Sequence, residues 1–441
     1  MSQINAGLLL LRPQGGRNLI AGTGRTPLVI PVAIDETCRE AVHVTRRLET
    51  EVGGHLFLRQ VISVPGLGGD RRLFVAEAQD DPVTQRTWIP TDEHRADLAR
   101  ALRTALAGEE AHERTYESVV DQALDMAQLP WCRPGWLGEL RRQLDAHFAE
   151  PTDVQPYKLR VGRLILRVAN SGGMYEVHAT ATADADANRW ANNTLQDAEQ
   201  RGLLRGWRPD LAGSFPDLGA EVRQAPIGTS LAMLGDLPTW SATMQSMVDL
   251  QIRSSMRGGL TAAASYGGGA LASRLEDCVQ QWQAHEVLGE GFGARSLKWI
   301  KDCILDAIEM LDASVLPPVI VNGAMTGFTT YASDGLIQIS EWHPTYIGHP
   351  FTTLARPLSH RAGALARHTQ ADLARPFVAG WLRFGRPADL SQEVKAGIVV
   401  GSAVQAISAW ETGRTFAASA APALGEQITE WCETILRRST G

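Results

Sequence analysis

Apolar and polar residues alternate in short runs along the N-terminal part of the chain. Four runs rich in leucine, isoleucine and valine are bounded by turn residues, as strands usually are, at Gly7–Arg12, Thr26–Ile34, His55–Val64 and Arg71–Ala78. One helical stretch, Glu36–Glu51, lies among them. This order of elements predicts a small α/β sandwich.

Helical spacing replaces this pattern after the last of these runs. Apolar residues recur at three- and four-residue steps over Glu93–Ala107 and Glu110–Gln128. The segment Leu129–Gly135 then brings two prolines and a glycine together, and such residues commonly interrupt regular structure. We therefore place a domain boundary after residue 128.

A second block of strands follows a predicted helix at Trp136–Phe148. Strands are expected on both sides of the turn Asn170–Gly173, and shorter strands come after a further helix. In chain order these elements are the strands Tyr157–Val168 and Met174–Ala181, the helix Asp186–Arg201, and the strands Ala220–Gln224 and Ser230–Leu234. We place the end of this block at residue 237.

The remainder, residues 238–441, has an almost wholly helical pattern. Its last helices are predicted at Pro376–Phe384, Leu390–Glu411 and Leu424–Arg437. A glycine-rich stretch, Met256–Ala270, follows no strand and opens no phosphate-gripping helix, so we interpret it as a loose loop. Strands that come first and helices that come later indicate an α+β fold of two lobes.

Composition narrows the classes of partner. The chain has 441 residues, 44% of them hydrophobic and 21% charged, with a formal net charge of −7 and no basic stripe. Such a chain can bury a core but offers little to a phosphate backbone, so we expect no nucleic acid partner. The apolar runs fall far short of the ~20 residues that span a bilayer, and no secretion signal is evident, so we expect no membrane partner.

Cysteine usage indicates the compartment. The five cysteines are far apart and never form a C-x-x-C spacing, so buried reduced thiols are expected rather than a zinc site or disulfides. We expect a cytoplasmic protein. These cysteines are Cys38, Cys132, Cys278, Cys303 and Cys432.

The segment Val319–Phe351 reads VIVNGAMTGFTTYASDGLIQISEWHPTYIGHPF. It resembles the catalytic region of the aminoglycoside phosphotransferase and choline kinase-like family, which has a bilobal, protein kinase-like fold. That family has a loop H-G-D-x-x-x-x-N, a short strand pair, D-W, and a helix start G-x-P-x-x-D-L-A. The resemblance extends from about Trp131 to the C-terminus and implies a nucleotide site between two lobes.

The frame is present, but its chemical groups are replaced. Asn322 stands for the histidine, Ala324 for the catalytic aspartate, Thr329 for the metal-binding asparagine, Glu341 for the metal-binding aspartate and Thr353 for the last aspartate. An alanine cannot accept the proton of a substrate hydroxyl. The weak metal candidates Thr329 and Glu341 offer one hydroxyl and one carboxylate that is a methylene too long.

Replacements continue upstream of this loop. Alignment of Val177–Ala179 with the family's lysine strand puts His178 in the place of the phosphate-binding lysine, and histidine is mostly neutral at pH 7. The next helix has no glutamate over Asp186–Thr194, while Asp236 keeps one acid at the hinge between lobes. A residual nucleotide cleft would therefore use His178, Asp236 and Glu341.

The predicted sandwich carries one further motif. Arg46–Gly53 reads RRLETEVG and resembles the Nudix motif R-E-U-x-E-E-x-G, where U is apolar. Arg47 and Thr50 replace two metal-binding glutamates, which leaves Glu51 as a weak metal ligand. The alternative is an ordinary amphipathic helix with a glycine cap at Gly53.

Three hypotheses remain open. The first is a pseudokinase without a required cofactor, a binding or regulatory protein whose small-molecule or protein ligand lies in the inter-lobe cleft. The second is an active phosphotransferase that uses ATP and magnesium on a small-molecule alcohol, with its base moved to His343 or Asn322. The third is an enzyme that uses the cleft for other group-transfer chemistry, with His178, Glu341 and His343.

Overall fold

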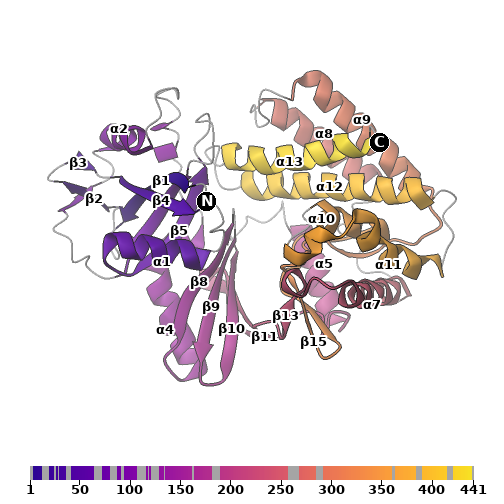
Figure 1. The fold of residues 1–441 in the computed structure, drawn as a ribbon, viewed down its shortest axis with the longest axis horizontal. Helices are drawn as coiled ribbons and strands as arrows, with labels where there is room; N and C mark the ends of the chain where they lie inside the picture. Colours follow the sequence, from indigo (N-terminus) through magenta and orange to yellow (C-terminus); the bar gives the residue numbers. More distant parts are fainter. Residues whose placement is uncertain are drawn as a thin grey trace. The chain divides into compact units, whose positions relative to one another are not determined.

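The computed structural model describes most of the chain. The described residues are 3–11, 19–23, 26–27, 29–35, 41–63, 72–79, 87–90, 94–106, 116–117, 119–120, 129–133, 135–160, 163–180, 189–256, 268–284, 292–359, 363–383, 390–414 and 421–439. Of the predicted helix Glu110–Gln128 only residues 116–117 and 119–120 are described, and these four are helical. Most of the glycine-rich stretch falls outside the described ranges. Helices and strands are mixed, as the predicted α+β class requires (Figure 1).

The chain divides into two compact units, each described by itself below. Unit 1 comprises Met1–Ala183, Leu211–Ala225 and Gly413–Ala423. Unit 2 comprises Asp184–Asp210, Pro226–Thr412 and Leu424–Gly441.

A seven-stranded mixed sheet forms the first part of unit 1 (Figure 1). The order is β3-β2-β1-β6-β5, with β4 paired to β1 and β7 paired to β2, and β1 runs parallel to β6. The strands are β1 (Gln3–Leu11), β2 (Leu19–Thr23), β3 (Thr26–Pro27), β4 (Ile30–Asp35), β5 (Leu56–Ser63), β6 (Arg72–Ala78) and β7 (Thr87–Pro90).

One helix packs against each face of this sheet. Helix α1 (Ala41–Val52) buries Val44, Leu48 and Val52 against Leu8 and Leu10 of β1. Helix α2 (Arg95–Leu106) packs on the opposite face, where the core includes Leu9 and Leu11 of β1. Because side chains alternate along a strand, β1 supplies both cores. The predicted α/β sandwich is confirmed.

A second, antiparallel sheet follows in unit 1. Its order is β11-β12-β10-β9-β8, from β8 (Asp153–Arg160), β9 (Arg163–Asn170), β10 (Gly173–Thr180), β11 (Leu211–Phe215) and β12 (Ala220–Gln224). The single strand predicted over Tyr157–Val168 is wrong, since β8 and β9 are paired antiparallel there. An apolar run that continues through a chain reversal does not reveal the reversal.

Two tryptophans of the segment before the second sheet make long-range hydrogen bonds within unit 1. The short 3-10 helix η1 (Pro130–Cys132) precedes α4 (Trp136–Phe148), and the Trp136 indole donates to the Leu218 carbonyl at 3.0 Å, near η2 (Pro216–Leu218). The Trp131 indole donates to the carbonyl of Arg59 in β5 at 3.2 Å. The segment predicted as a domain boundary is thus tied to the first sheet.

Unit 2 is mainly helical, with two small sheets. Strands β13 (Thr229–Ser230), β15 (Thr330–Ser333) and β16 (Leu336–Ile339) form one sheet, and β14 (Val319–Asn322) pairs with β17 (Thr345–Gly348). The helices are α5 (Arg189–Gln200), α6 (Leu231–Leu234), α7 (Leu237–Met256), α8 (Gly268–Ala284), α9 (Ala294–Asp312), α10 (Ala355–Ser359), α11 (Gln370–Leu382), α12 (Leu390–Arg414) and α13 (Ala421–Ser439), with 3-10 turns η4 (Pro350–Leu354) and η5 (Gly363–Arg367).

Two predicted elements of unit 2 are wrong in detail. The strand expected at Ser230–Leu234 is mostly helix α6, closed by Gly235 at φ 61°; periodicity cannot separate helix from strand in four apolar residues. Helix α11 begins at Gln370 and not at Pro376, because Thr369 and Asp372 form a capping box that starts it earlier.

Two further expectations concern the state of the cysteines and helices that could span a membrane. The four described cysteines are free; Cys278 and Cys432 are buried, and Cys132 and Cys303 are half-buried. Burial raises the pKa of the Cys132 thiol to about 12. No helix in the described part of the chain has both the length and the apolar character to cross a bilayer.

Candidate functional site

The loop expected to carry the chemistry begins at the end of β14 in unit 2. Strand β14 is buried throughout, and its register with β17 places Asn322 opposite Thr345. Chain segments on both sides of the loop are therefore fixed by one strand pair, which brings Asn322 close to the segment around Glu341.

Asn322, at the position of the family's histidine, joins two backbone segments. Its side-chain oxygen accepts a hydrogen bond from the Ala324 amide at 2.7 Å, and its side-chain nitrogen donates to the Glu341 carbonyl at 3.2 Å. The side chain is 1% exposed. Both ends of the amide are thus used inside the loop.

Thr329, at the position of a metal-binding asparagine, closes the same loop. Its hydroxyl donates to the Ala324 carbonyl at 3.0 Å and accepts from the Thr326 amide at 2.8 Å. In return the Thr329 amide donates to the Thr326 hydroxyl at 3.2 Å. A hydroxyl has one proton and two lone pairs, so these bonds use most of its capacity.

The residues between them pack closely against α12. Ala324 is 2% exposed, so its methyl group lies inside the protein. The Gly323 amide donates to the Pro344 carbonyl at 2.8 Å, and the Gln405 side chain donates to the Gly323 carbonyl at 2.8 Å. A Cβ at Gly323 would lie 2.6 Å from the Gln405 amide nitrogen, so the close approach requires glycine there.

Glu341 is the remaining carboxylate of the frame. It is 3% exposed, and the neighbouring Ser340 amide donates to the Thr329 carbonyl at 2.9 Å. The structure therefore brings Asn322, Ala324, Thr329 and Glu341 together in one buried loop system. Within the described residues, no three histidine, cysteine, aspartate or glutamate side chains gather in a way that could hold a metal ion.

Thr353 belongs to a hydrogen-bonded group that the sequence did not reveal. Its hydroxyl accepts from the Gln251 side chain at 2.8 Å, and the same nitrogen donates to the Ile320 carbonyl at 3.1 Å. The Trp381 indole donates to the Gln251 oxygen at 3.2 Å. The one available signal was a glutamine on the apolar face of α7, where it is fully buried.

A second buried group missed by sequence reasoning surrounds His349. The His349 Nδ1 accepts from the Phe351 amide at 3.3 Å, and Nε2 lies 3.2 Å from the Ser314 hydroxyl and 3.7 Å from the Glu393 carboxylate. Ser314 donates to Glu393 at 2.7 Å. Burial lowers the pKa of His349 from 6.5 to about 4, so the ring is neutral at pH 7.

His178, the residue expected to replace the phosphate-binding lysine, lies on β10 in unit 1. Its Nε2 is 3.3 Å from a carboxylate oxygen of Glu176, two residues earlier on the same face of the sheet. Glu176 is 2% exposed, and its other oxygen has no hydrogen bond to a described residue. Alternation along the strand could have pointed to Glu176 from the sequence.

Asp236, expected at the hinge, caps helix α7. Its carboxylate accepts from the Thr239 amide at 2.7 Å, and this bond holds the pKa of the Asp236 carboxyl below its ordinary value. An acidic side chain at a helix N-terminus also interacts favourably with the helix dipole. The structure thus gives Asp236 a local structural partner.

In the Nudix-like motif, the side chain of Glu51 lies outside the described residues. Gly53 has φ 74°, and its amide donates to the Glu49 carbonyl at 2.8 Å. This is the geometry of a glycine that ends a helix. The cap is compatible with either interpretation of the motif.

Solved structures of phosphotransferases are similar to this chain. The aminoglycoside phosphotransferase APH(4)-Ia is 12% identical, with 69% of this chain and 100% of that one covered and a TM-score of 0.47. The choline kinase of Cryptosporidium parvum Iowa II is 8% identical, with 66% and 89% covered and a TM-score of 0.47. The choline kinase LicA of Streptococcus pneumoniae is 9% identical, with 68% and 99% covered and a TM-score of 0.47.

No protein-family model matches the chain, and no curated protein sequence does. The solved structures similar to it are thus of the kind that the sequence motifs predicted. Their identities and TM-scores carry no argument about activity, ligand or residue roles, so none is transferred.

Proposed function

We propose that this chain is an aminoglycoside phosphotransferase-like pseudokinase, a binding or regulatory protein without metal-dependent phosphoryl transfer. The observation that carries the proposal is the loop closed by Thr329, whose hydroxyl bonds the Ala324 carbonyl and the Thr326 amide. Groups that would face a substrate in a phosphotransferase of this family instead hold the loop backbone.

The absence of a general base at position 324 supports this proposal. Ala324 has no atom that can accept a proton, and its methyl group is buried. Loss of a general base commonly lowers a rate by about 10²- to 10⁴-fold. Asn322 is no substitute in this arrangement, because an amide is not a base and both of its ends are bonded.

A magnesium site is poorly supported by the same residues. Magnesium requires near-octahedral oxygen ligands with short bonds, and the Thr329 hydroxyl already directs its proton and a lone pair to the loop. Of the two positions that bind metal in the family, only Glu341 then offers a ligand, a single carboxylate. These residues do not fit the metal of the family, and we derive no step through it.

The surroundings of His178 also argue against phosphoryl transfer. A phosphate clamp needs a permanent cation, and His178 has the buried carboxylate of Glu176 at 3.3 Å. That carboxylate would repel a phosphate group. The strand position that resembles the family's lysine site therefore has no permanent cation to bind phosphate.

Titration calorimetry with ATP, with and without magnesium, tests the proposal together with a phosphoryl-transfer assay on choline and an aminoglycoside. We expect no magnesium-dependent turnover. Turnover that requires magnesium and well exceeds the uncatalysed rate would contradict it.

Glu341 favours a second candidate, an active phosphotransferase with relocated catalytic groups. It keeps a carboxylate, 3% exposed beside the loop, at the position of the family's metal-binding aspartate. This candidate predicts that Glu341→Gln abolishes activity while the fold persists in circular dichroism. A variant with unchanged turnover would exclude it.

The sandwich of unit 1 is, in our proposal, a degenerate Nudix-like domain. Its support is the position of the motif on α1, which packs on one face of a mixed sheet and ends at Gly53. Arg47 and Thr50 occupy positions where carboxylates would hold magnesium. We expect no magnesium-dependent hydrolysis of a dinucleoside polyphosphate; hydrolysis abolished by Glu51→Gln would contradict this. The domain boundaries after residues 128 and 237 stay predictions.

A further inference from the structure

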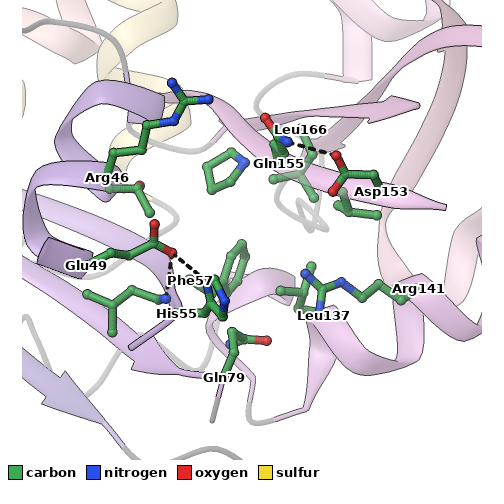
Figure 2. A pocket seen from close by; sticks show the side chains of 14 residues that line it. Arg46, Glu49, His55, Phe57, Gln79, Leu137, Arg141, Asp153, Gln155 and Leu166 are labelled. Carbon is green, nitrogen blue, oxygen red and sulfur yellow. Dashed lines mark hydrogen bonds and ion pairs between the residues drawn. The ribbon is translucent and has the colours of Figure 1, made fainter. Parts of the chain in front are cut away.

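A pocket of about 390 Å³ lies within unit 1, and none of the residues discussed as phosphotransferase groups lines it (Figure 2). Its walls come from α1 and the start of β5 on one side and from α4 and the start of β8 on the other. The volume falls in the usual range for small-molecule sites, roughly 300–1,000 Å³.

Part of the pocket wall is apolar and well packed. Phe57 and Leu166 are fully buried, and Leu137 and Val154 are nearly so. The Phe57 ring stacks on Trp136, with the ring centres 6.1 Å apart and the planes 15° from parallel. Side chains held in this way form a stable surface for the apolar body of a ligand.

The two carboxylates of the pocket have partners other than its arginines. Glu49 accepts a hydrogen bond from the Leu56 amide at 3.0 Å and lies 3.6 Å from the His55 ring (Figure 2). Asp153 accepts a hydrogen bond from the Gln155 side chain at 2.8 Å. Neither carboxylate pairs with an arginine of the pocket.

Two arginines line the pocket, one on α1 and one on α4. Figure 2 shows Arg46 on α1 and Arg141 on α4, with the Arg141 side chain extended toward the middle of the space. Neither guanidinium has a hydrogen bond or ion pair with any residue in the described part of the chain. By contrast, Arg142, next to Arg141, pairs with Glu139. A guanidinium is always charged and is shaped to bind a carboxylate or phosphate.

One buried hydroxyl in the wall is also without a partner. Thr45 is 4% exposed and lines the pocket, and its hydroxyl oxygen has no hydrogen bond to a described residue. A buried hydroxyl left unbonded is unfavourable, so such groups in native proteins usually meet a ligand or water. The pocket wall thus combines one unbonded buried hydroxyl, that of Thr45, with two arginines that have no ion pair within the described residues.

The geometry points to a binding site for a small organic anion, a molecule with a phosphate or carboxylate group on an apolar body. Arg46 and Arg141 would hold the anionic group, Thr45 would donate a further hydrogen bond, and the body would lie against the apolar part of the wall at Leu137 and Val154. This site is independent of the proposed loss of phosphoryl transfer, because no residue of the Asn322–Glu341 loop contributes to it.

Calorimetry on the full chain with simple probes tests the site. Phenyl phosphate and benzoate carry an anion on an apolar body, inorganic phosphate has the anion alone, and phenol has the body alone. We expect phenyl phosphate or benzoate to bind at least about 10-fold more tightly than inorganic phosphate and phenol. The tighter of the two identifies the anionic group. No binding of either at about 10 mM, or equal binding of all four, overturns the proposal.

Variants of neighbouring residues provide matched controls. Arg46→Gln and Arg141→Gln should each weaken binding of the better probe about 10- to 100-fold, the effect of losing a charge-assisted hydrogen bond. Arg47→Gln and Arg142→Gln alter the next residue of the same helices and should change it less than about 2-fold. Equal effects of the two pairs would show a general charge effect and overturn the assignment.

Thr45→Val separates binding from folding. The variant removes an unbonded buried hydroxyl with little change of shape, so thermal stability should stay the same or rise. Affinity for the better probe should nevertheless fall about 3- to 10-fold. Unchanged affinity in this variant, together with unchanged affinity in both arginine variants, would mean that the probes bind elsewhere and would overturn the site.

Discussion

The hydroxyl of Thr329 donates a hydrogen bond to the carbonyl oxygen of Ala324, five residues earlier, at 3.0 Å. The two positions correspond, in the family that the sequence resembles, to a metal ligand and a catalytic base. Here they are two ends of one structural bond inside a buried loop. This relationship is the reason to expect stability, and not turnover, to respond to mutations in the loop.

Thr329→Val is expected to destabilise unit 2 by about 1–3 kcal/mol, because the Ala324 carbonyl and the Thr326 amide would lose a buried partner. Chemical denaturation followed by tryptophan fluorescence measures the change. Ser333→Ala is the control, since Ser333 makes one exposed bond to Asp334, and should shift stability by less than about 0.5 kcal/mol. An equal shift for both variants would contradict the structural role of Thr329.

Gln251→Leu should destabilise the protein more strongly, by about 2–4 kcal/mol. The substitution removes the hydrogen bonds that Gln251 makes with the Thr353 hydroxyl, the Ile320 carbonyl and the Trp381 indole, all of them buried. Gln280→Leu, on the exposed face of α8, is the matched control and should be nearly neutral. A neutral Gln251→Leu would show that the group adds nothing to stability.

The neutral state of His349 predicts a pH dependence. Its pKa is lowered from 6.5 to about 4, so the folded protein resists protonation more than the unfolded chain. The contribution to stability is complete above about pH 6.5 and is lost as the pH falls toward 4, up to about 3 kcal/mol. The Glu393 carboxylate at 3.7 Å reduces this loss, because it attracts the protonated ring.

Denaturation of the wild type and of His349→Gln between pH 7 and pH 4 measures this effect. The wild type should lose stability over that range more steeply than the variant, which lacks the titrating ring. Parallel pH profiles for the two proteins would contradict the assigned cause.

In unit 1, the loss of a buried ion pair should lower stability more than the loss of an exposed one. Arg59 pairs with Glu77 where both side chains are at most 5% exposed, and Arg59 also donates to the Cys132 carbonyl at 2.9 Å. Glu77→Gln should therefore cost about 3–5 kcal/mol, because it leaves a buried guanidinium without its counter-charge. Glu139→Gln breaks the exposed pair with Arg142 and should change stability by at most about 1 kcal/mol. Thermal unfolding of the two variants provides the comparison.

Sequence patterns predicted the layered parts of the fold well, for a physical reason. Alternation along β1 and four-residue spacing on α1 each record which side of an element is buried, so the sandwich could be inferred. Short elements have too few residues for a periodic pattern to be recognised. The four residues of α6 were taken for a strand, and the reversal between β8 and β9 was missed.

For the candidate site, too, the local motif could be predicted from the sequence and the tertiary contacts could not. The frame of Val319–Phe351 located the loop, and Asn322, Thr329 and Glu341 do come together there. Other contacts of this region come from residues distant in sequence and could not be predicted. Gln405 on α12 donates to the Gly323 carbonyl, and Gln251 on α7 donates to the Thr353 hydroxyl. The pocket between α1 and α4 depended on tertiary packing alone, and no local motif marked Arg141.

The most direct test of the account is a phosphoryl-transfer assay on the wild type and Glu341→Gln with labelled ATP and magnesium, with choline and an aminoglycoside as acceptors. We expect that neither protein transfers phosphate above the uncatalysed rate and that magnesium has no effect. Magnesium-dependent transfer by the wild type that disappears in Glu341→Gln would contradict the central claim, because it would show that the loop still supports catalysis.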